Sequence, residues 1–215
     1  PFNPRASNHR NDDYCEGTAW QWTWFVPHDV DGLVELMGGR DAFIGKLDSL
    51  FTADSKLEGE STSVDISGLI GQYAHGNEPS HHIAHLYNYV GQPWRTQEIV
   101  DEVLHTLYFN NPDGLSGNED CGQMSAWYIL NAMGFYQVCP GKPVYSIGRP
   151  LFNEATVHLK DGKSFKVIAH NNSRDNKYVR SIVLNGNKLE TPFFTHQDIV
   201  DGGTLELTMG SEPLK

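Results

Sequence analysis

The stretch "ATVHLKDGKSFKVIAHN", residues 155–171, alternates apolar and polar side chains on both sides of Asp161-Gly162. A period of two is typical of half-buried β-strands, and an Asp-Gly pair between two such runs indicates a hairpin. "YVRSIVLNGNKLE", residues 178–190, repeats the pattern around Asn185-Gly186. "GGTLELTMG", residues 202–210, predicts one more short strand. This part of the chain is therefore predicted to be antiparallel β, either a sandwich or a sheet packed on another domain.

Residues 17–138 follow a helical period instead. "DVDGLVELMGGRDAFIGKLDSLF", residues 29–51, predicts two helices separated by Gly38-Gly39. Three further helices are predicted: over residues 80–90 up to Gly91, over residues 96–109 with Thr96 as N-cap, and over residues 121–136 up to Gly134. The chain is thus predicted to be α+β, with a helical part over residues 1–139 and antiparallel strands over residues 140–215.

Charge and hydropathy exclude two classes of partner. The chain has 215 residues and a net charge of −11, from 27 acidic against 16 basic residues. A nucleic-acid partner would require a basic face, so none is expected. No run of the sequence approaches the roughly 18 apolar residues of a membrane span, so no membrane-spanning segment is predicted. The chain begins "PFNPRASNHR" without Met or signal peptide, which predicts a mature, cleaved or excised piece.

One acid stands among tryptophans in "YCEGTAWQWTWFVPHDV", residues 14–30. Apolar walls disfavour the charged form of a carboxyl, and in this way the pKa of Glu16 would rise so that it serves as a general acid. The alternative is a core-lining aromatic helix with Glu16 at its exposed N-terminus, stabilised by the helix dipole. The residues themselves leave both interpretations open.

A second acidic segment is "GNEDCGQ", residues 117–123, directly before an apolar helix. Glu119 and Asp120 are either ordinary N-caps of that helix, or Asp120 is kept ionised by helix N–H groups and acts as a base. An acid kept neutral and a second acid kept ionised are the pair that glycoside hydrolysis requires. The two segments together point weakly to that reaction.

A third polar segment is "GQYAHGNEPSHH", residues 71–82. Its histidines fit no zinc pattern, whereas Asn77 and Glu78 offer oxygen ligands of the kind that a hard cation such as calcium prefers. Sugar-binding groups and a plain polar loop with hydrogen-bonded histidines are the other interpretations.

Longer blocks resemble a known family. They are "EGTAWQWTWFVPHD", "GNEPSHHIAHLYNYVGQPWRTQ", "GNEDCGQMSAWYILNAMGFYQVCPG", "YSIGRPLF" and "DIVDGGTLELTMG". In this order they resemble the C-terminal part of glycoside hydrolase family 92, the calcium-dependent exo-acting α-mannosidases. The resemblance implies an N-terminal β-sandwich packed on an (α/α)6 toroid, with the chain supplying the last helices of that toroid and the closing strands. It implies that the N-terminal sandwich is a missing partner.

The resemblance also implies roles for individual residues. Glu16 stands at the place of the general acid and Asp120 at that of the base in an inverting hydrolysis of terminal α-linked mannose from glycans such as N-glycans. Asn118 stands where many members have an aspartate that assists the base. The calcium ligands implied are Gln72, Asn77 and Glu78, and the groups placed near the sugar are Trp20, His81, His82 and Glu119. The family's habit implies a periplasmic or extracellular location.

A non-catalytic carbohydrate-binding module is the alternative function, because tryptophans and histidines also hold sugars without hydrolysing them. The variant Glu16→Gln separates the two, because it removes turnover and spares binding only in an enzyme. If residues of the N-terminal part complete the pocket, the isolated chain lacks them and is expected to be inactive.

Overall fold

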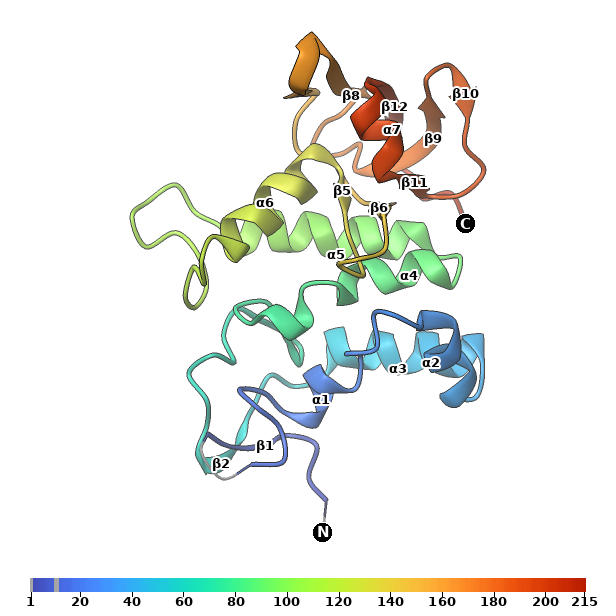
Figure 1. Ribbon diagram of the computed structural model, residues 1–215. Helices are drawn as coiled ribbons and strands as arrows, with labels where there is room; N and C mark the ends of the chain where they lie inside the picture. The colour runs from blue at the N-terminus through green and yellow to red at the C-terminus, as the bar shows by residue number, and fades with distance from the viewer. Residues whose placement is uncertain (1, 10–11) are drawn as a thin grey trace. The chain divides into compact units, whose positions relative to one another are not determined.

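The chain folds as two compact units in the computed structural model, which describes residues 2–9 and 12–215. The first unit comprises Pro1–Ile83 with Thr106–Ser125, and the second comprises Ala84–His105 with Ala126–Lys215. Figure 1 labels the helices and strands along the chain. The domain boundary predicted at residues 139 and 140 stays a prediction, and the two compact units divide at other points.

The first unit has three helices near its N-terminus. α1 spans Ala19–Trp22, α2 spans Val30–Leu36 and α3 spans Arg40–Thr52. Of these, α2 and α3 are the two helices predicted over residues 29–51. The break at Gly38-Gly39 is confirmed, because both glycines take positive φ values, of 95° and 100°, that other residues rarely adopt. α3 buries an apolar stripe made of Phe43, Leu47, Leu50 and Phe51.

The segment that follows α3 is not helical, which corrects the prediction of one helical pattern over residues 17–138. It contains β2 (Glu58–Ser61), parallel to β1 (Ala6–Asn8), and a hairpin of β3 (Leu69–Ile70) and β4 (Tyr73–Ala74). Gly68 and Gly71 flank β3 with φ values of 60°, a left-handed conformation that a continuous helix cannot include.

Two predicted helix starts also differ in the structure. α5 spans Pro93–Thr106, so that Pro93 rather than Thr96 opens it, since proline fits the first turn, where no intrahelical N–H bond is needed. The helix predicted over residues 80–90 is reduced to short 3₁₀ turns and α4, Leu86–Tyr89. α6 spans Gln123–Met133 and ends, as predicted, before Gly134 with φ 103°.

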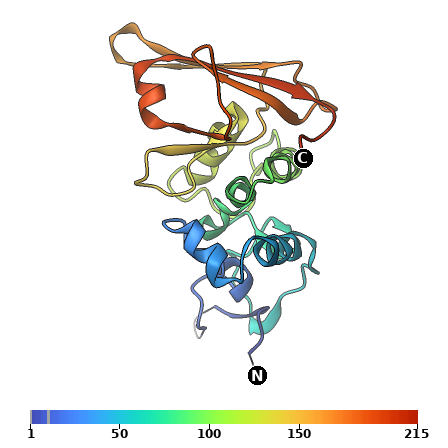
Figure 2. The ribbon, with the colours of Figure 1, turned by 90° about the vertical axis from the view of Figure 1, so that its right-hand side faces the viewer.

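The second unit contains a five-stranded sheet in the order β10-β9-β12-β8-β7. Figure 2 shows the strands of this part of the chain in orange and red. Its strands are β7 (Glu154–His158), β8 (Ser164–His170), β9 (Tyr178–Leu184), β10 (Asn187–Lys188) and β12 (Gly203–Gly210). Both predicted hairpins are confirmed, because β7 pairs antiparallel with β8 and β9 pairs antiparallel with β10.

The prediction of an all-antiparallel sheet is wrong at one position, since β12 pairs in parallel with β8. β12 also lies antiparallel to β9. The chain reverses between β8 and β9, so any strand inserted between them must run parallel to one of the two.

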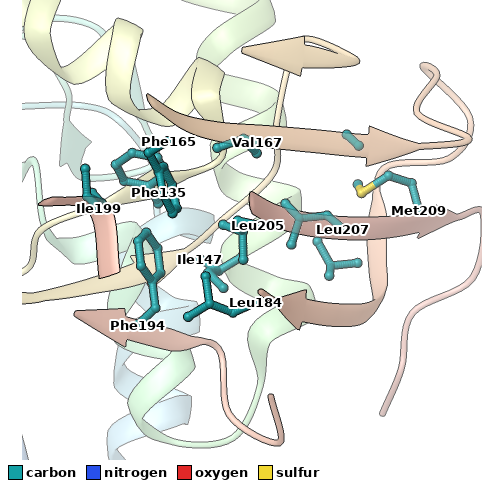
Figure 3. Close-up of a cluster of buried hydrophobic side chains, with 12 residues drawn as sticks. Phe135, Ile147, Phe165, Val167, Leu184, Phe194, Ile199, Leu205, Leu207 and Met209 are labelled. Carbon is teal, nitrogen blue, oxygen red and sulfur yellow. The ribbon is translucent and has the colours of Figure 1, made fainter. Parts of the chain in front are cut away.

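A three-stranded sheet, in the order β11-β6-β5, packs against the larger sheet. Its strands are β5 (Phe135–Tyr136), β6 (Val144–Ile147) and β11 (Phe193–Thr195), and the short helix α7 (His196–Asp201) follows β11. Figure 3 shows the shared core, in which Phe135, Ile147 and Phe194 meet Phe165, Leu205 and Leu207 of the larger sheet. The fold is therefore a mixture of helices and small, open sheets. Among the described residues, no helix has the length and apolar character needed to cross a bilayer.

Candidate active site

Three acidic side chains from distant parts of the sequence, Glu16, Glu78 and Asp120, lie near one another in the first unit. The charges of Asp120 and Glu16 both raise the pKa of Glu78, which identifies the two as its neighbours. Glu16 and Asp120 are exposed, whereas Glu78 is half-buried. Two solvent-accessible carboxyl groups thus flank a third that is partly desolvated.

Burial is the largest cause of the raised pKa of Glu78, and the hydrogen bond with the Asp120 side chain and the nearby charges add to it. The backbone N–H of Glu78 acts in the opposite direction. The Asp120 side chain therefore disfavours a charge on Glu78, which makes the two acids interacting neighbours.

The loop that carries Glu16 is held from two sides. Asn77 donates from Nδ2 to the carbonyl oxygen of Glu16 at 2.7 Å, and Trp22 donates from Nε1 to the carbonyl of Cys15 at 2.8 Å. A Cβ at Gly17 would lie 2.7 Å from that indole nitrogen, so only glycine leaves room for Trp22. Thr18 then caps α1 through a capping box, which places Glu16 just before a helix start.

Glu16 is exposed, which favours the second interpretation of this segment, an acid at the exposed start of an aromatic helix, over enclosure by apolar walls. Trp24 is buried edge-on against Phe43. Trp20 lies beneath the Nζ atom of Lys46, 4.4 Å from the ring centroid. Among the contacts recorded for the described residues, only that of Trp22 joins a tryptophan of this segment to the Glu16 loop.

The turn that carries Asp120 has an uncommon backbone. Asp120, Cys121 and Gly122 have φ values of 47°, 57° and 89°, a region that non-glycine residues rarely populate. The N–H of Gln123 donates to the carbonyl of Asp120 at 3.2 Å and closes this turn. This turn places Asp120 directly before α6.

Glu119 has the capping role that the sequence left open. Its two oxygens accept from the N–H of Ser125 at 2.8 Å and from the Ser125 hydroxyl at 2.7 Å. These hydrogen bonds, first that from the backbone, lower the pKa of Glu119. Asn118, like Glu119, is exposed. The carboxylate that stabilises the start of α6 is therefore Glu119, which leaves Asp120 for the contact with Glu78.

Two glycines allow the Asp120 segment to approach the Glu78 segment. A Cβ at Gly117 would lie 2.9 Å from the carbonyl oxygen of Gly76 and 2.9 Å from Oγ of Ser67. Gly117 has a φ of 70° and Gly76 lies one residue before Asn77. Close backbone contact at this point brings the two acidic segments together.

The variant Gly117→Ala is expected to lose about 1–3 kcal/mol of unfolding free energy, because the new Cβ adds a clash to an unfavourable positive φ. Gly141→Ala is the matched control, since Gly141 has a φ of 101° and open space around a Cβ. Urea unfolding measures both. Equal losses in the two variants would contradict the close approach at Gly117.

The predicted sugar-binding histidines lie in the interior. His81 is 2% exposed, and its Nε2 lies 2.9 Å from the carbonyl oxygen of His75. Burial, followed by the neighbouring His82, lowers the pKa of His81 to about 4 against the opposing effect of that carbonyl. The pKa of His82 is lowered by burial, and its Nε2 lies 2.8 Å from the carbonyl of Trp24. Direct contact of either ring with a sugar stays a prediction.

His75 is buried between two tyrosine hydroxyls, at 2.8 Å from Tyr73 and 2.7 Å from Tyr108. The Tyr108 hydroxyl donates onward to the carbonyl of Met124 at 3.1 Å. It therefore accepts from Nε2–H of His75, whose Nδ1 accepts from Tyr73. Burial, with a smaller effect of His81, holds the pKa of His75 well below its usual value, so the ring is neutral.

The predicted calcium ligands are only partly brought together. Asn77 accepts through Oδ1 from the N–H of Glu78 at 3.1 Å, so these two side chains are neighbours. Gln72 is fully buried, and its amide group donates to the carbonyls of Asp54 and Lys56. No contact recorded for residues 2–9 and 12–215 joins Gln72 to the other two, and no three His, Cys, Asp or Glu side chains there could hold a metal ion.

Sequence reasoning missed Gln123, whose side-chain Nε2 lies 3.1 Å from Nδ1 of His81. The signal was present, because Gln123 follows Asp120 by three residues and opens the helix. The site as a whole brings together three carboxyl groups from three segments, and carboxyl groups can donate or accept protons in acid–base chemistry.

Comparison with known proteins identifies the family. The family model described as "Glycosyl hydrolase family 92 catalytic domain" matches residues 1–211. An "Uncharacterized secreted glycosidase" of Arthroderma benhamiae is 32% identical over 200 residues, which are 92% of this chain and 24% of the relative. The chain thus spans about a quarter of the length of that curated relative.

Solved structures agree with this result. A family GH92 alpha-mannosidase from Bacteroides thetaiotaomicron, in complex with mannoimidazole, superposes with a TM-score of 0.92 at 42% identity, over 100% of this chain and 29% of its own. A family GH92 inverting mannosidase from Bacteroides thetaiotaomicron VPI-5482 has a TM-score of 0.80 at 44% identity, over 93% of this chain and 28% of its own. Family model, sequence relative and folds coincide, and the chain belongs to glycosyl hydrolase family 92.

Proposed function

We propose that this chain is part of an exo-acting α-mannosidase that hydrolyses terminal α-linked mannose from glycans such as N-glycans with inversion at the anomeric carbon. Membership of the family and the likeness to two mannosidases support the reaction class. The observation that carries the proposal is the meeting of Glu16 and Asp120 at Glu78, because it brings the proposed acid and base to one site.

In the proposed mechanism Glu16 donates its proton to the glycosidic oxygen as that oxygen leaves. Asp120 removes a proton from a water molecule on the opposite face of the sugar ring. Inversion requires space for that water, so we expect the two carboxyl groups to lie roughly 6.5–9.5 Å apart when substrate is bound. The exposed position of Glu16 is consistent with a proton donor that is covered only when substrate or another part of the protein closes over it.

The residues at Glu78 fit a calcium ion by their chemistry. The partly buried Glu78 carboxylate is a suitable oxygen ligand for a hard cation, and Asn77 adds a carboxamide oxygen beside it. Oε1 of Gln72 is buried and has no hydrogen-bond partner among the described residues, so it too is available as an oxygen ligand. We propose Gln72, Asn77 and Glu78 as the ligands. When bound, the ion would hold sugar hydroxyls and offset negative charge at the site.

Chelation tests the calcium proposal. Removal of calcium from the full-length enzyme is expected to lower kcat/KM at least about tenfold, because the acids around Glu78 then repel one another without a counter-charge. Added calcium is expected to restore the rate and to raise the melting temperature with increasing concentration. If neither the activity nor the melting temperature changes when chelator or calcium is added, the proposed calcium site is wrong.

The remaining predicted residues receive different proposed roles. Trp20 and His82 are proposed to lie beside the sugar, with Asn118 supporting the base. Glu119 and His81 are proposed to act on the sugar only through the loops that they hold, because Ser125 occupies both oxygens of Glu119 and the chain engages both ring nitrogens of His81.

The chain is proposed to work together with the remaining length of its relatives. It covers 29% of one mannosidase and 28% of another, so about 70% of each lies outside the match. We propose that residues 1–139 contribute the last helices of an (α/α)6 catalytic domain, that residues 140–215 are its closing strands, and that an N-terminal β-sandwich completes the pocket. A periplasmic or extracellular location is supported by the relative described as secreted.

The stereochemistry of the first product tests the proposed reaction. The full-length protein, incubated with an aryl α-mannoside, is expected to release β-mannose first, as followed by proton NMR before mutarotation. Release of α-mannose would overturn inversion. Binding of mannosides without release of mannose would favour the carbohydrate-binding module.

A further inference from the structure

Gln123 links the turn of the proposed base to a buried histidine. Its backbone N–H donates to the carbonyl of Asp120, and its side-chain Nε2 lies 3.1 Å from Nδ1 of His81. Gln123 is the first residue of α6, so both contacts arise at the point where the strained turn enters the helix.

The geometry of His81 defines the direction of this hydrogen bond. Its Nε2 faces the carbonyl oxygen of His75 at 2.9 Å, and a carbonyl only accepts, so the proton sits on Nε2. Nδ1 of the neutral ring is then an acceptor, and the amide group of Gln123 is its donor. A side chain at position 123 without an N–H group cannot replace this contact.

The contacts close a ring that begins and ends at the acidic pair. The backbone N–H of His81 donates to the carbonyl of Glu78 at 3.0 Å, and the Asp120 side chain is close enough to Glu78 to raise its pKa. The ring therefore runs from Glu78 through His81 and Gln123 to Asp120 and back. Asp120 and Cys121 both take left-handed φ values that persist only where surrounding structure holds them.

We propose that Gln123, held by His81, is a positioning residue that fixes the Asp120 carboxyl against Glu78 and so sets the direction in which the base faces its water. This inference rests on the proposed function, because it assigns Gln123 through the role of Asp120. Gln123 touches neither substrate nor water in this scheme. It acts by preventing the 120–122 turn from relaxing.

The test is Gln123→Met in the full-length enzyme, since Met keeps the length and helix propensity of Gln and removes the donor. A misplacement of the base by about 1 Å can lower the rate about 10²-fold, so kcat for 4-nitrophenyl α-mannoside is expected to fall between about 10- and 100-fold. KM is expected to change by less than about threefold and the melting temperature by only a few degrees, as for one lost hydrogen bond.

Azide supplies a readout that a merely structural role would not move. Azide needs no deprotonation, so it attacks the anomeric carbon without help from Asp120. The C1–N bond forms, the C1–O bond to nitrophenol breaks, and the proton of Glu16 goes to the leaving oxygen. Azide is expected to increase turnover by Gln123→Met and by Asp120→Asn and to yield β-mannosyl azide, and to have little effect on the wild type.

Gln197→Met is the control, because Gln197 is an exposed helix residue of α7 that bonds only its own helix neighbour Asp201 in the recorded contacts. Wild-type kcat in Gln123→Met, or a lowered kcat that azide does not raise, would overturn the positioning role while leaving wild-type inversion intact. A wild-type protein that releases α-mannose, or no mannose, would instead overturn the proposed function together with the inference that rests on it.

Discussion

Replacing Glu16 by Gln in the full-length enzyme is expected to lower kcat between about 10²- and 10⁴-fold on a mannoside with a poor leaving group, because the amide cannot donate the proton. On a 2,4-dinitrophenyl mannoside the loss is expected to be far smaller, because the dinitrophenolate group leaves without being protonated. Asp120→Asn is expected to lower kcat by a similar factor on both substrates, because water must be deprotonated whichever group leaves. Steady-state kinetics on the two substrates separates the two roles.

Glu35→Gln serves as the matched control, since Glu35 is an exposed acid on α2. Mannose affinity, measured by calorimetry, is expected to persist in Glu16→Gln. Equal losses for Glu16→Gln on both substrates would contradict its role as acid. An unaltered rate in that variant would remove Glu16 from the mechanism altogether.

Replacing Arg149 by Met is expected to lower the unfolding free energy by about 3–5 kcal/mol, because it removes the nearest cation from Asp101 and breaks the other hydrogen bonds of a buried guanidinium. Among the described residues, Asp101 keeps only His105 at 3.2 Å and the exposed Arg174 at 3.8 Å. Nε of Arg149 lies 2.9 Å from Asp101, and the Arg149 side chain is 2% exposed. The guanidinium also donates to the carbonyl of Pro150 at 2.7 Å and to that of Ser173 at 3.1 Å. One side chain thus joins α5 to two loops of the β region.

Lys166→Met is the comparison for this variant, because Lys166 pairs with Glu154 at 2.9 Å with both side chains well exposed. An exposed pair contributes about 1 kcal/mol or less. Urea unfolding of the two variants at the same pH measures the difference. A loss in Arg149→Met no larger than that in Lys166→Met would show that the buried pair contributes no more than a solvated one.

Local chemistry predicted most elements of the β region. Asp161-Gly162 and Asn185-Gly186 specify hairpins because adjacent residues can reverse the chain without distant contacts. The parallel pairing of β12 with β8 was not predictable in this way, because strand insertion depends on which neighbour lies alongside, and alternation is the same for either direction. The prediction that Thr96 is the N-cap of α5 was wrong, because the helix begins earlier, at Pro93.

The candidate site, too, was predictable from the sequence only in part. The resemblance pointed to Glu16, Glu78 and Asp120, and the structure brings their segments together. Sequence proximity suggested that three indoles surround Glu16, yet Trp24 packs into the core and Trp20 beneath Lys46. Residues adjacent in sequence point to different sides of a short helix, so closeness along the chain did not mean contact.

The sequence by itself determined the helix break at Gly38-Gly39 and the hairpins at Asp161-Gly162 and Asn185-Gly186, since these depend on backbone preferences within a few residues. Only the tertiary structure decided that Glu119 caps α6 and that Gln123 meets His81, a contact between residues 42 positions apart. A short motif cannot encode such contacts, because they depend on where two loops meet. That meeting depends in turn on the close packing of Gly117 against Gly76.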